Sequence, residues 1–380
     1  LDLDVDQDYS RLESAKETLD FLVRNKAKII IIGHKGRPSH EEKLSLGPLV
    51  EKISQLVNKN VAFSETLNIP DTGVVLVENL RFNPGEETNN EAFAKNLASL
   101  ADFYVNEAFA VSHRSHASII GIPRFLPHAA GFHFIAEVEN LSKILETPKR
   151  PLLFIISGIK KDKVGMIERS KSVADLILVA GRLPEYLGED YKDDKKVIVA
   201  DLIPDKEDIT MNSIERFESE IAKAGTIVLA GVPGKYEDEG HRQGTEKIFK
   251  AVANSSAFKV AGGGDTEAAL TIFGLTDKFD WISVGGGAML EFLTKGTLPG
   301  IKALTNSVVT NNTRDFREEV GSFLKDEYLR GRMSIERCQE IAEEVKRLEN
   351  IGNTPNFMIN LASKFPEINK IVEKYKYGGR

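Results

Sequence analysis

The sequence predicts an α/β protein built from two doubly wound parallel-sheet lobes, and three observations carry this prediction. Short apolar runs rich in Ile, Val and Leu alternate with helical patterns along most of the chain. These runs are continuous rather than alternating, which is typical of strands covered on both faces. At 380 residues the chain is also too long for one ordinary core, and an apolar helical stripe divides it.

The individual elements follow from the same patterns. Buried strands are predicted at residues 27–32, 74–77, 103–105, 152–156, 176–179, 197–199, 226–229, 258–261 and 281–284. Helical patterns such as 12–23 and 91–100 lie between them. Strand followed by helix, repeated, indicates doubly wound, Rossmann-like sheets, with an α/β barrel as the alternative from this pattern alone. The alternating opening run, residues 1–5, predicts one further strand, of which the leading half is absent.

The division between the lobes falls near residues 132–147. Phe134, Val138, Leu141 and Leu145 lie on one helical stripe, and the segment 148–151 then breaks the pattern with two prolines. We therefore predict an N-terminal lobe at residues 1–135, an interdomain helix and hinge at 136–150, and a C-terminal lobe at 151–305. Residues 306–380 are charged and poor in strand patterns, which predicts a helical C-terminal extension.

Two interpretations of the extension stay open. Ile335, Ile341, Val345 and Leu348 can form an apolar face for an oligomer or partner. The alternative, which we favour, is that this face packs on the extension's own lobe. We expect a monomer.

Composition excludes several classes of protein. A hydrophobic fraction of 41% with a net charge of −7 is typical of a globular protein and argues against a nucleic-acid or membrane-surface binder. Any functional cations must then be gathered locally. The single cysteine, Cys338, cannot form an internal disulfide. With no signal peptide or spanning segment in the sequence, this predicts a cytoplasmic protein.

Basic side chains follow three strands of the first lobe. Residues 33–38, 78–82 and 106–116 each come directly after a predicted strand and carry His or Arg, and Asp2 and Asp4 share one side of the opening strand. Ligands of parallel sheets lie beyond the carboxyl ends of the strands. Any single Arg is best explained as a surface salt bridge, but the set predicts a phosphate or carboxylate site.

Glycine and lysine follow the strands of the second lobe. The segments are 157–163, 231–237, 262–266 and 285–287, and the last two open helices. Such turns bring backbone N–H groups to a phosphate at a helix N-terminus, and Asp265 can bind a phosphate-bridging Mg²⁺. Tight strand–helix packing explains one such turn equally well, whereas two turns with nearby lysines favour a nucleotide. The P-loop, dinucleotide-binding and protein-kinase motifs are absent.

Together these segments resemble one family. Residues 33–38, 78–82, 105–109 with 113–118, 262–266, and 285–288 with 298–300 resemble phosphoglycerate kinase in order and spacing, over about residues 1–304. The resemblance implies reversible phosphoryl transfer between 1,3-bisphosphoglycerate and Mg-ADP, giving 3-phosphoglycerate and Mg-ATP in glycolysis and gluconeogenesis. It also implies the following roles.

In the first lobe, the resemblance assigns Asp2, Asp4, His34, Arg37, Arg81 and Arg114 to the phosphoglycerate. It assigns Arg11 and Lys160 to the moving phosphoryl group, with N–H groups from Gly263 and Gly264. For the nucleotide it implies Gly158, Lys163, Gly231, Glu237, Gly262, Asp265 and Thr266. Glu237 corresponds to the ribose-binding residue, and Asp265 to the magnesium ligand.

The chain departs from the family pattern at several points. Asp4 stands where the family usually has Asn, and residues 157–163 are one residue shorter than the usual GGAKVSDK segment. A tryptophan-containing turn is replaced by residues 229–232, and the extension has no family counterpart. These departures motivate the alternative of a catalytically weakened relative that acts as a nucleotide- or metabolite-binding scaffold.

Overall fold

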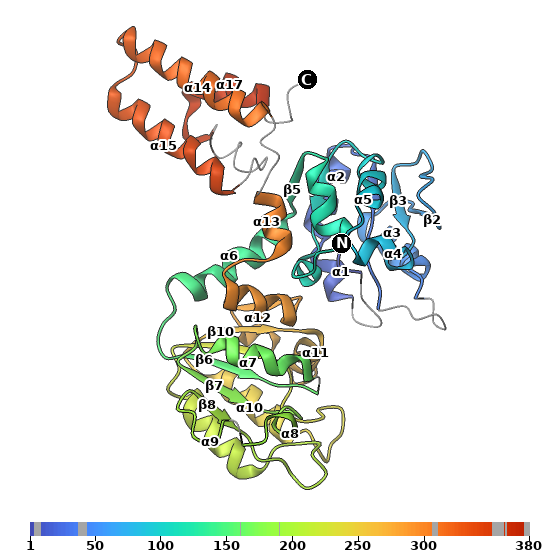
Figure 1. Cartoon of the computed structure of the whole chain (residues 1–380), viewed down its shortest axis with the longest axis vertical. Helices are drawn as coiled ribbons and strands as arrows, with labels where there is room; N and C mark the ends of the chain where they lie inside the picture. The colour runs from blue at the N-terminus through green and yellow to red at the C-terminus, as the bar shows by residue number, and fades with distance from the viewer. Residues whose placement is uncertain are drawn as a thin grey trace.

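The fold is an α/β arrangement of two parallel-sheet lobes with a helical body at the C-terminal end (Figure 1). The structure is a computed structural model that describes residues 1–3, 9–36, 44–159, 161–189, 191–305, 311–351, 361 and 363–375. The predicted fold class is confirmed. Among these residues, no helix combines the length and apolar character that crossing a bilayer requires.

The second lobe is built on six parallel strands in the order β11-β10-β9-β6-β7-β8. Their bounds are β6 Leu152–Ile156, β7 Leu176–Val179, β8 Val197–Val199, β9 Thr226–Ala230, β10 Phe258–Gly262 and β11 Trp281–Ser283. The chain builds outward from β6 to β8, then returns to β9 on the other side of β6. The topological switch point therefore lies between β6 and β9, and ligands of such sheets bind at this point.

Helices cover both faces of this sheet, because its strands are apolar on both sides. One face packs against α7 (Val164–Ser170), α12 (Gly286–Lys295) and α6 (Phe132–Glu146). The other packs against α9 (Met211–Ile221), α10 (Gln243–Asn254) and α11 (Gly264–Ile272). The short helix α8 (Pro184–Leu187) follows β7.

The first lobe contains two separate parallel pairings. One sheet has the order β1-β3-β2, and β4 pairs with β5. The strands are β1 Ile29–Ile31, β2 Ala62–Ser64, β3 Val74–Val77, β4 Tyr104–Asn106 and β5 His128–Ala130. The helices are α1 Ser10–Ser14, α2 Lys16–Arg24, α3 Val50–Val57, α4 Pro84–Glu87 and α5 Glu91–Ala98.

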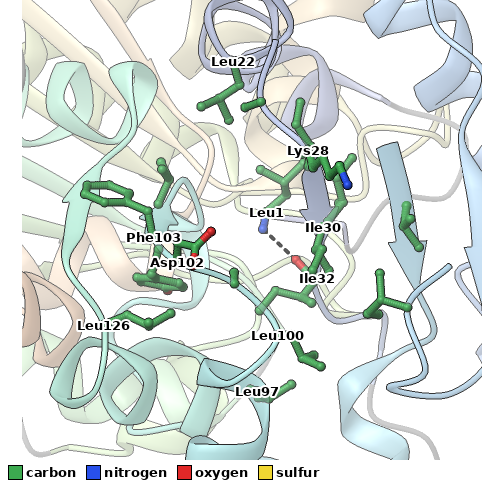
Figure 2. A pocket seen from close by; sticks show the side chains of 18 of the residues that line it. Leu1, Leu22, Lys28, Ile30, Ile32, Leu97, Leu100, Asp102, Phe103 and Leu126 are labelled. Atoms are coloured by element: carbon green, nitrogen blue, oxygen red, sulfur yellow. Dashed lines mark hydrogen bonds between the residues drawn. The ribbon is translucent and has the colours of Figure 1, made fainter. Parts of the chain in front are cut away.

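A mostly apolar cavity of about 660 Å³ lies between β1 and β4 (Figure 2). Leu22, Ile30, Leu100 and Leu126 are among its lining residues. The amino group of Leu1 donates a hydrogen bond of 2.8 Å to the Ile32 carbonyl within it.

Three details differ from the predicted elements. Residues 1–3 are not a strand, because a single bond from the Leu1 nitrogen does not make a ladder; residues 4–8 lie outside the described residues. The predicted helix 12–23 is two helices that meet at Ala15. The strands β2 and β5 were not predicted.

The helix α6 is fixed by two buried glutamates. Glu107 accepts hydrogen bonds from the backbone N–H groups of His133 and Phe134, at 3.1 and 2.9 Å, and so caps the first turn of α6. Glu137 accepts from Trp281 Nε1 and the Val284 N–H, both at 2.8 Å. The helix is therefore bound to both lobes.

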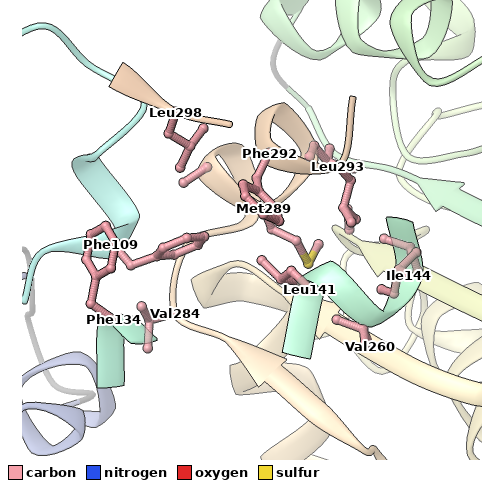
Figure 3. Close-up of a cluster of buried hydrophobic side chains, with 14 of the residues drawn as sticks. Phe109, Phe134, Leu141, Ile144, Val260, Val284, Met289, Phe292, Leu293 and Leu298 are labelled. Carbon is pink, nitrogen blue, oxygen red and sulfur yellow. The ribbon is translucent and has the colours of Figure 1, made fainter. Parts of the chain in front are cut away.

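Apolar packing around α6 is continuous between the lobes. One buried cluster runs from the first lobe through Phe109 and Phe134 to Leu141 and onward to Met289 and Phe292 (Figure 3). Because the interior here is shared, the lobes are not joined by α6 alone.

The helices after residue 298 continue into a body with its own core. They are α13 Pro299–Thr305, α14 Asn311–Leu329, α15 Ile335–Ile351 and α17 Asn369–Tyr375. Ile341 and Val345 are buried in a cluster with Phe316 and Phe365, all from the extension, whereas the Ile335 side chain is 47% exposed. The apolar face is thus mostly covered by the extension itself rather than by the second lobe. The Leu348 side chain lies outside the described residues, and the predicted domain limits stay our proposal.

Truncating Leu141 to alanine should reduce the free energy of unfolding by about 3 kcal/mol, because it empties a fully buried position in the shared cluster. Denaturant unfolding followed by fluorescence of Trp281, the single tryptophan, measures this. Leu329→Ala is the control, since that side chain is 70% exposed, and should change stability by less than about 0.5 kcal/mol. Equal effects of the two variants would contradict the shared core.

Candidate active site

The strand ends of the first lobe gather most of the predicted anion-site residues that the structure describes. Asp2 is buried and accepts a 2.9 Å hydrogen bond from the Ala110 N–H. Burial raises the pKa of the Asp2 carboxyl, while the Ala110 hydrogen bond and the nearby Arg11 and His34 oppose this shift. Asp2, Arg11 and His34 are therefore close enough to act on one another.

Arg81 and Arg114 flank the same edge. The Arg81 guanidinium donates to the Gly36 carbonyl and lies 3.3 Å from Glu87 Oε1. It is thereby held against the loop that follows β1. Burial and then the charge of His34 lower the pKa of the His116 imidazole to about 4, with smaller contributions from Arg81 and Arg114. His116 is therefore neutral at neutral pH, and the arginines supply positive charge.

A buried acid lies under these basic groups. Glu86 Oε1 is 2.6 Å from His34 Nε2 and accepts a 2.6 Å hydrogen bond from Ser118 Oγ. The Ser118 N–H donates to Glu86 Oε2 at 3.1 Å. Burial alone would raise the pKa of Glu86. The hydrogen bond and charge of His34 and the hydrogen bond from Ser118 outweigh the effect of burial, so the pKa is lowered. The carboxylate is ionised.

In the second lobe, the predicted nucleotide residues surround the switch point between β6 and β9. Lys163 Nζ donates a 2.6 Å hydrogen bond to the Ser157 carbonyl, and it lies against Gly158 and Gly231. Gly231 has a φ of +103°, and a Cβ there would lie 2.0 Å from the Ser157 carbonyl oxygen. Only glycine allows the two strand ends to approach this closely.

The start of α11 forms the other side of this site. The buried Thr266 Oγ1 accepts a 2.9 Å hydrogen bond from the Gly231 N–H, which ties β9 to α11. Gly263, with a φ of +108°, is the N-cap residue and follows Gly262, the last residue of β10. Because Gly264 and Asp265 are exposed in the first turn, the positive end of the helix is open to an anion.

Glu237 lies near this helix start. Burial and the charges of Glu237 and Asp265 raise the pKa of the Tyr236 hydroxyl to about 12. Tyr236 therefore has both carboxylates as neighbours, and both are exposed. The described residues Gly158, Lys163, Gly231, Glu237, Gly262, Asp265 and Thr266 thus form one region of the second lobe.

One contact joins the two regions. Arg11 Nη2 lies 3.7 Å from the point that a Cβ on Gly264 would occupy. A cation of the first lobe therefore reaches the open helix end of the second lobe. A second link is the 2.9 Å hydrogen bond that the Gly300 N–H donates to the Ser112 carbonyl.

Three predicted residues, Asp4, Arg37 and Lys160, lie outside the described residues. The structure adds buried acids that were not predicted: Glu86, Glu107, Glu137 and Asp208. Asp208 accepts a hydrogen bond from the Gly244 N–H at 2.9 Å and so holds the start of α10, the helix that follows the loop with Glu237. For Glu86, the local sequence offers one signal, the asparagine–proline pair at the start of α4. This pair indicates where a helix begins, and it does not indicate that the acid is buried.

The chain is similar to known proteins over most of its length. The phosphoglycerate kinase family model matches residues 3–188 and 186–296. The phosphoglycerate kinase of Finegoldia magna is 34% identical over 360 residues, which cover 78% of this chain and 91% of that protein. That of Dictyoglomus turgidum is 35% identical over 358 residues, with 78% and 90% covered.

The chain belongs to the phosphoglycerate kinase family. Solved structures of the family agree: that from Coxiella burnetii has a TM-score of 0.65 at 32% identity, covering 80% of this chain and 94% of that one. That from Pyrococcus horikoshii OT3 has a TM-score of 0.70 at 26% identity with the same coverage. The enzyme is a phosphotransferase with a carboxyl group as acceptor, and the scaffold alternative is not favoured. The family match ends before α14.

Replacing Thr266 with valine should weaken ADP binding, because the Gly231 N–H loses its acceptor and the loop after β9 is no longer tied to α11. An unsatisfied buried N–H should also cost about 1–3 kcal/mol of stability. Calorimetry and urea unfolding measure the two effects. Thr271→Val is the control, since that hydroxyl bonds only within an exposed turn of the same helix. Unchanged ADP affinity in Thr266→Val would contradict the placement of the nucleotide beside this turn.

Proposed function

We propose that the enzyme transfers a phosphoryl group directly between phosphoglycerate held on the first lobe and a nucleotide held on the second. In one direction, a carboxylate oxygen of 3-phosphoglycerate attacks the γ-phosphorus of ATP, and the β–γ bridging oxygen leaves with ADP. The reverse reaction uses 1,3-bisphosphoglycerate and ADP. The observation that carries this proposal is the approach of Arg11 to Gly264 at the start of α11.

The first lobe supplies the groups that orient phosphoglycerate. Arg81 and Arg114 offer planar guanidinium groups that suit a phosphate or carboxylate, and Asp2 and His34 lie at the same edge. We assign Asp4 and Arg37 to this set because they match the family motif. Holding the acceptor in one orientation converts a bimolecular step into an effectively unimolecular one.

The second lobe supplies the groups that hold the nucleotide phosphates. The N–H groups of Gly263 and Gly264 and the positive end of α11 favour negative charge on the transferred group. Gly158, Gly231 and Gly262 let the backbone approach the phosphates, and Lys163 neutralises charge at the switch point. We assign Lys160 to the moving phosphoryl group and Glu237 to the ribose.

The residues fit a magnesium ion bound together with the nucleotide. Asp265 offers an exposed carboxylate in the first turn of α11, and a hard oxygen donor that leaves room for phosphate oxygens is what Mg²⁺ prefers. When bound beside Asp265, the ion would neutralise negative charge on the nucleotide phosphates. Arg11, from the opposite lobe, adds positive charge on the side of the acceptor.

We propose a monomer in a cytoplasmic, reducing setting. The free, half-buried thiol of Cys338 fits such a setting. The extension shields most of its apolar residues in its own cluster, which agrees with a body that folds within one chain.

A coupled assay of ATP-dependent phosphorylation of 3-phosphoglycerate should show turnover that requires magnesium. The coupling reaction reports 1,3-bisphosphoglycerate formation, and chelation with EDTA should abolish the signal. Calorimetry of ADP binding serves as the control for a folded nucleotide site. Bound ADP without turnover would instead support the scaffold alternative.

Arg11→Ala should reduce kcat by about 100-fold or more, because positive charge around the transferred group is lost in the transition state. ADP affinity should stay within about twofold, since Arg11 comes from the other lobe. Lys16→Ala is a matched control, because this exposed lysine forms an ion pair with Asp20 on the surface of the next helix, away from Gly264. Turnover that survives Arg11→Ala would remove Arg11 from the mechanism.

A further inference from the structure

We propose that Glu86 is the positioning residue of the anion site, and this inference rests on the proposed function of the first lobe. Glu86 has no exposed surface, yet it is an ionised carboxylate. A buried charge is unfavourable unless its partners satisfy it. The buried Glu86 carboxylate therefore has to be stabilised by specific contacts.

Those contacts join three strand ends. Glu86 lies on α4, which follows β3; His34 lies in the loop after β1; Ser118 lies in the segment after β4. The carboxylate holds His34 Nε2 at 2.6 Å, Ser118 Oγ at 2.6 Å and the Ser118 N–H at 3.1 Å. These are the same three strand ends that carry the basic residues of the site, so one side chain sets their separation.

The contact with Glu86 also determines which nitrogen of the His34 ring carries a hydrogen. A carboxylate oxygen can only accept, so at 2.6 Å the Nε2 atom must carry the hydrogen. His116 packs edge-on against His34, with ring centroids 5.1 Å apart, and its Nδ1 lies 3.8 Å from Glu86 Oε1 without a hydrogen-bond partner. Both imidazoles are therefore oriented around the carboxylate.

A metal ion is the other ligand that this cluster suggests. His34, Glu86 and His116 place potential ligand atoms within 4.8 Å of one another. However, the positive charges of Arg81 and Arg114 act on His116, and both oxygens of Glu86 already accept hydrogen bonds. Cationic surroundings disfavour a second cation and favour an anionic ligand, so we assign the cluster to positioning.

The direction in which Glu86→Gln changes the affinity for 3-phosphoglycerate distinguishes a positioning role from a purely electrostatic one. Glu86→Gln keeps the size of the side chain but removes a negative charge beside the anion site. If Glu86 acted only through its charge, the variant would bind an anion more tightly. If Glu86 positions the three strand ends, the variant should bind 3-phosphoglycerate about tenfold more weakly, as expected from losing about one charge-assisted hydrogen bond.

The experiment measures 3-phosphoglycerate and ADP binding by calorimetry, and kcat and KM in the coupled assay, for the wild type, Glu86→Gln and Ser118→Ala. We expect KM for 3-phosphoglycerate to rise about tenfold in Glu86→Gln, whereas ADP affinity and kcat change by less than about threefold. Ser118→Ala, which removes one hydroxyl bond but leaves the charge, should give a smaller rise of the same kind.

Thermal unfolding of each variant ensures that binding is measured on folded protein, and Ser118→Ala keeps the test valid if Glu86→Gln does not fold. Unchanged or tighter 3-phosphoglycerate binding in Glu86→Gln, or a parallel loss of ADP affinity, would overturn the positioning role. A wild-type enzyme that neither binds nor phosphorylates 3-phosphoglycerate would instead overturn the proposed function itself.

Discussion

The arrangement depends first on the two buried glutamates that fix α6 between the lobes. Glu107 caps the first turn of the helix from the first lobe, and Glu137 accepts hydrogen bonds from Trp281 and Val284, at the two ends of β11 in the second lobe. Each carboxylate is almost completely buried, so each bond is made away from water, where an unmade one is costly. The apolar cluster around Leu141 then fills the space that these bonds define.

Because α6 is held in this way, the ligand-binding edges of two separate sheets meet on one side of it. A doubly wound sheet binds its ligand at one edge only, and transfer between two ligands needs two such edges within reach. Arg11 beside Gly264 is the point where the edges meet. In the proposed mechanism, charged groups from both lobes replace water around the moving phosphoryl group there, which would also protect an acyl phosphate from hydrolysis. Within the first lobe, Glu86 plays the corresponding part by linking three strand ends.

Much of the fold could be predicted from the sequence, because strands covered on both faces are continuous apolar runs. The prediction succeeded for β6, whose five residues are all buried, and failed for β2, a half-buried edge strand of three residues. Cations and glycines were assigned to the site because they directly follow strands, and their roles stay predictions. Glu86 and Glu137 were missed, since nothing in their local sequence shows that distant elements bury them. Their role depends on packing between segments far apart in the chain.

The most direct test of this account is to measure kcat and the affinities for ADP and 3-phosphoglycerate in Glu137→Gln. A glutamine can accept one of the two hydrogen bonds, but its amide N–H groups oppose the other donor. The account predicts that kcat falls by about tenfold or more because the edges are misplaced, while both ligands bind their own lobes normally. Glu139→Gln, at an exposed position on the same helix, should match the wild type. Unchanged kcat in Glu137→Gln would contradict the claim that α6 sets the geometry of transfer.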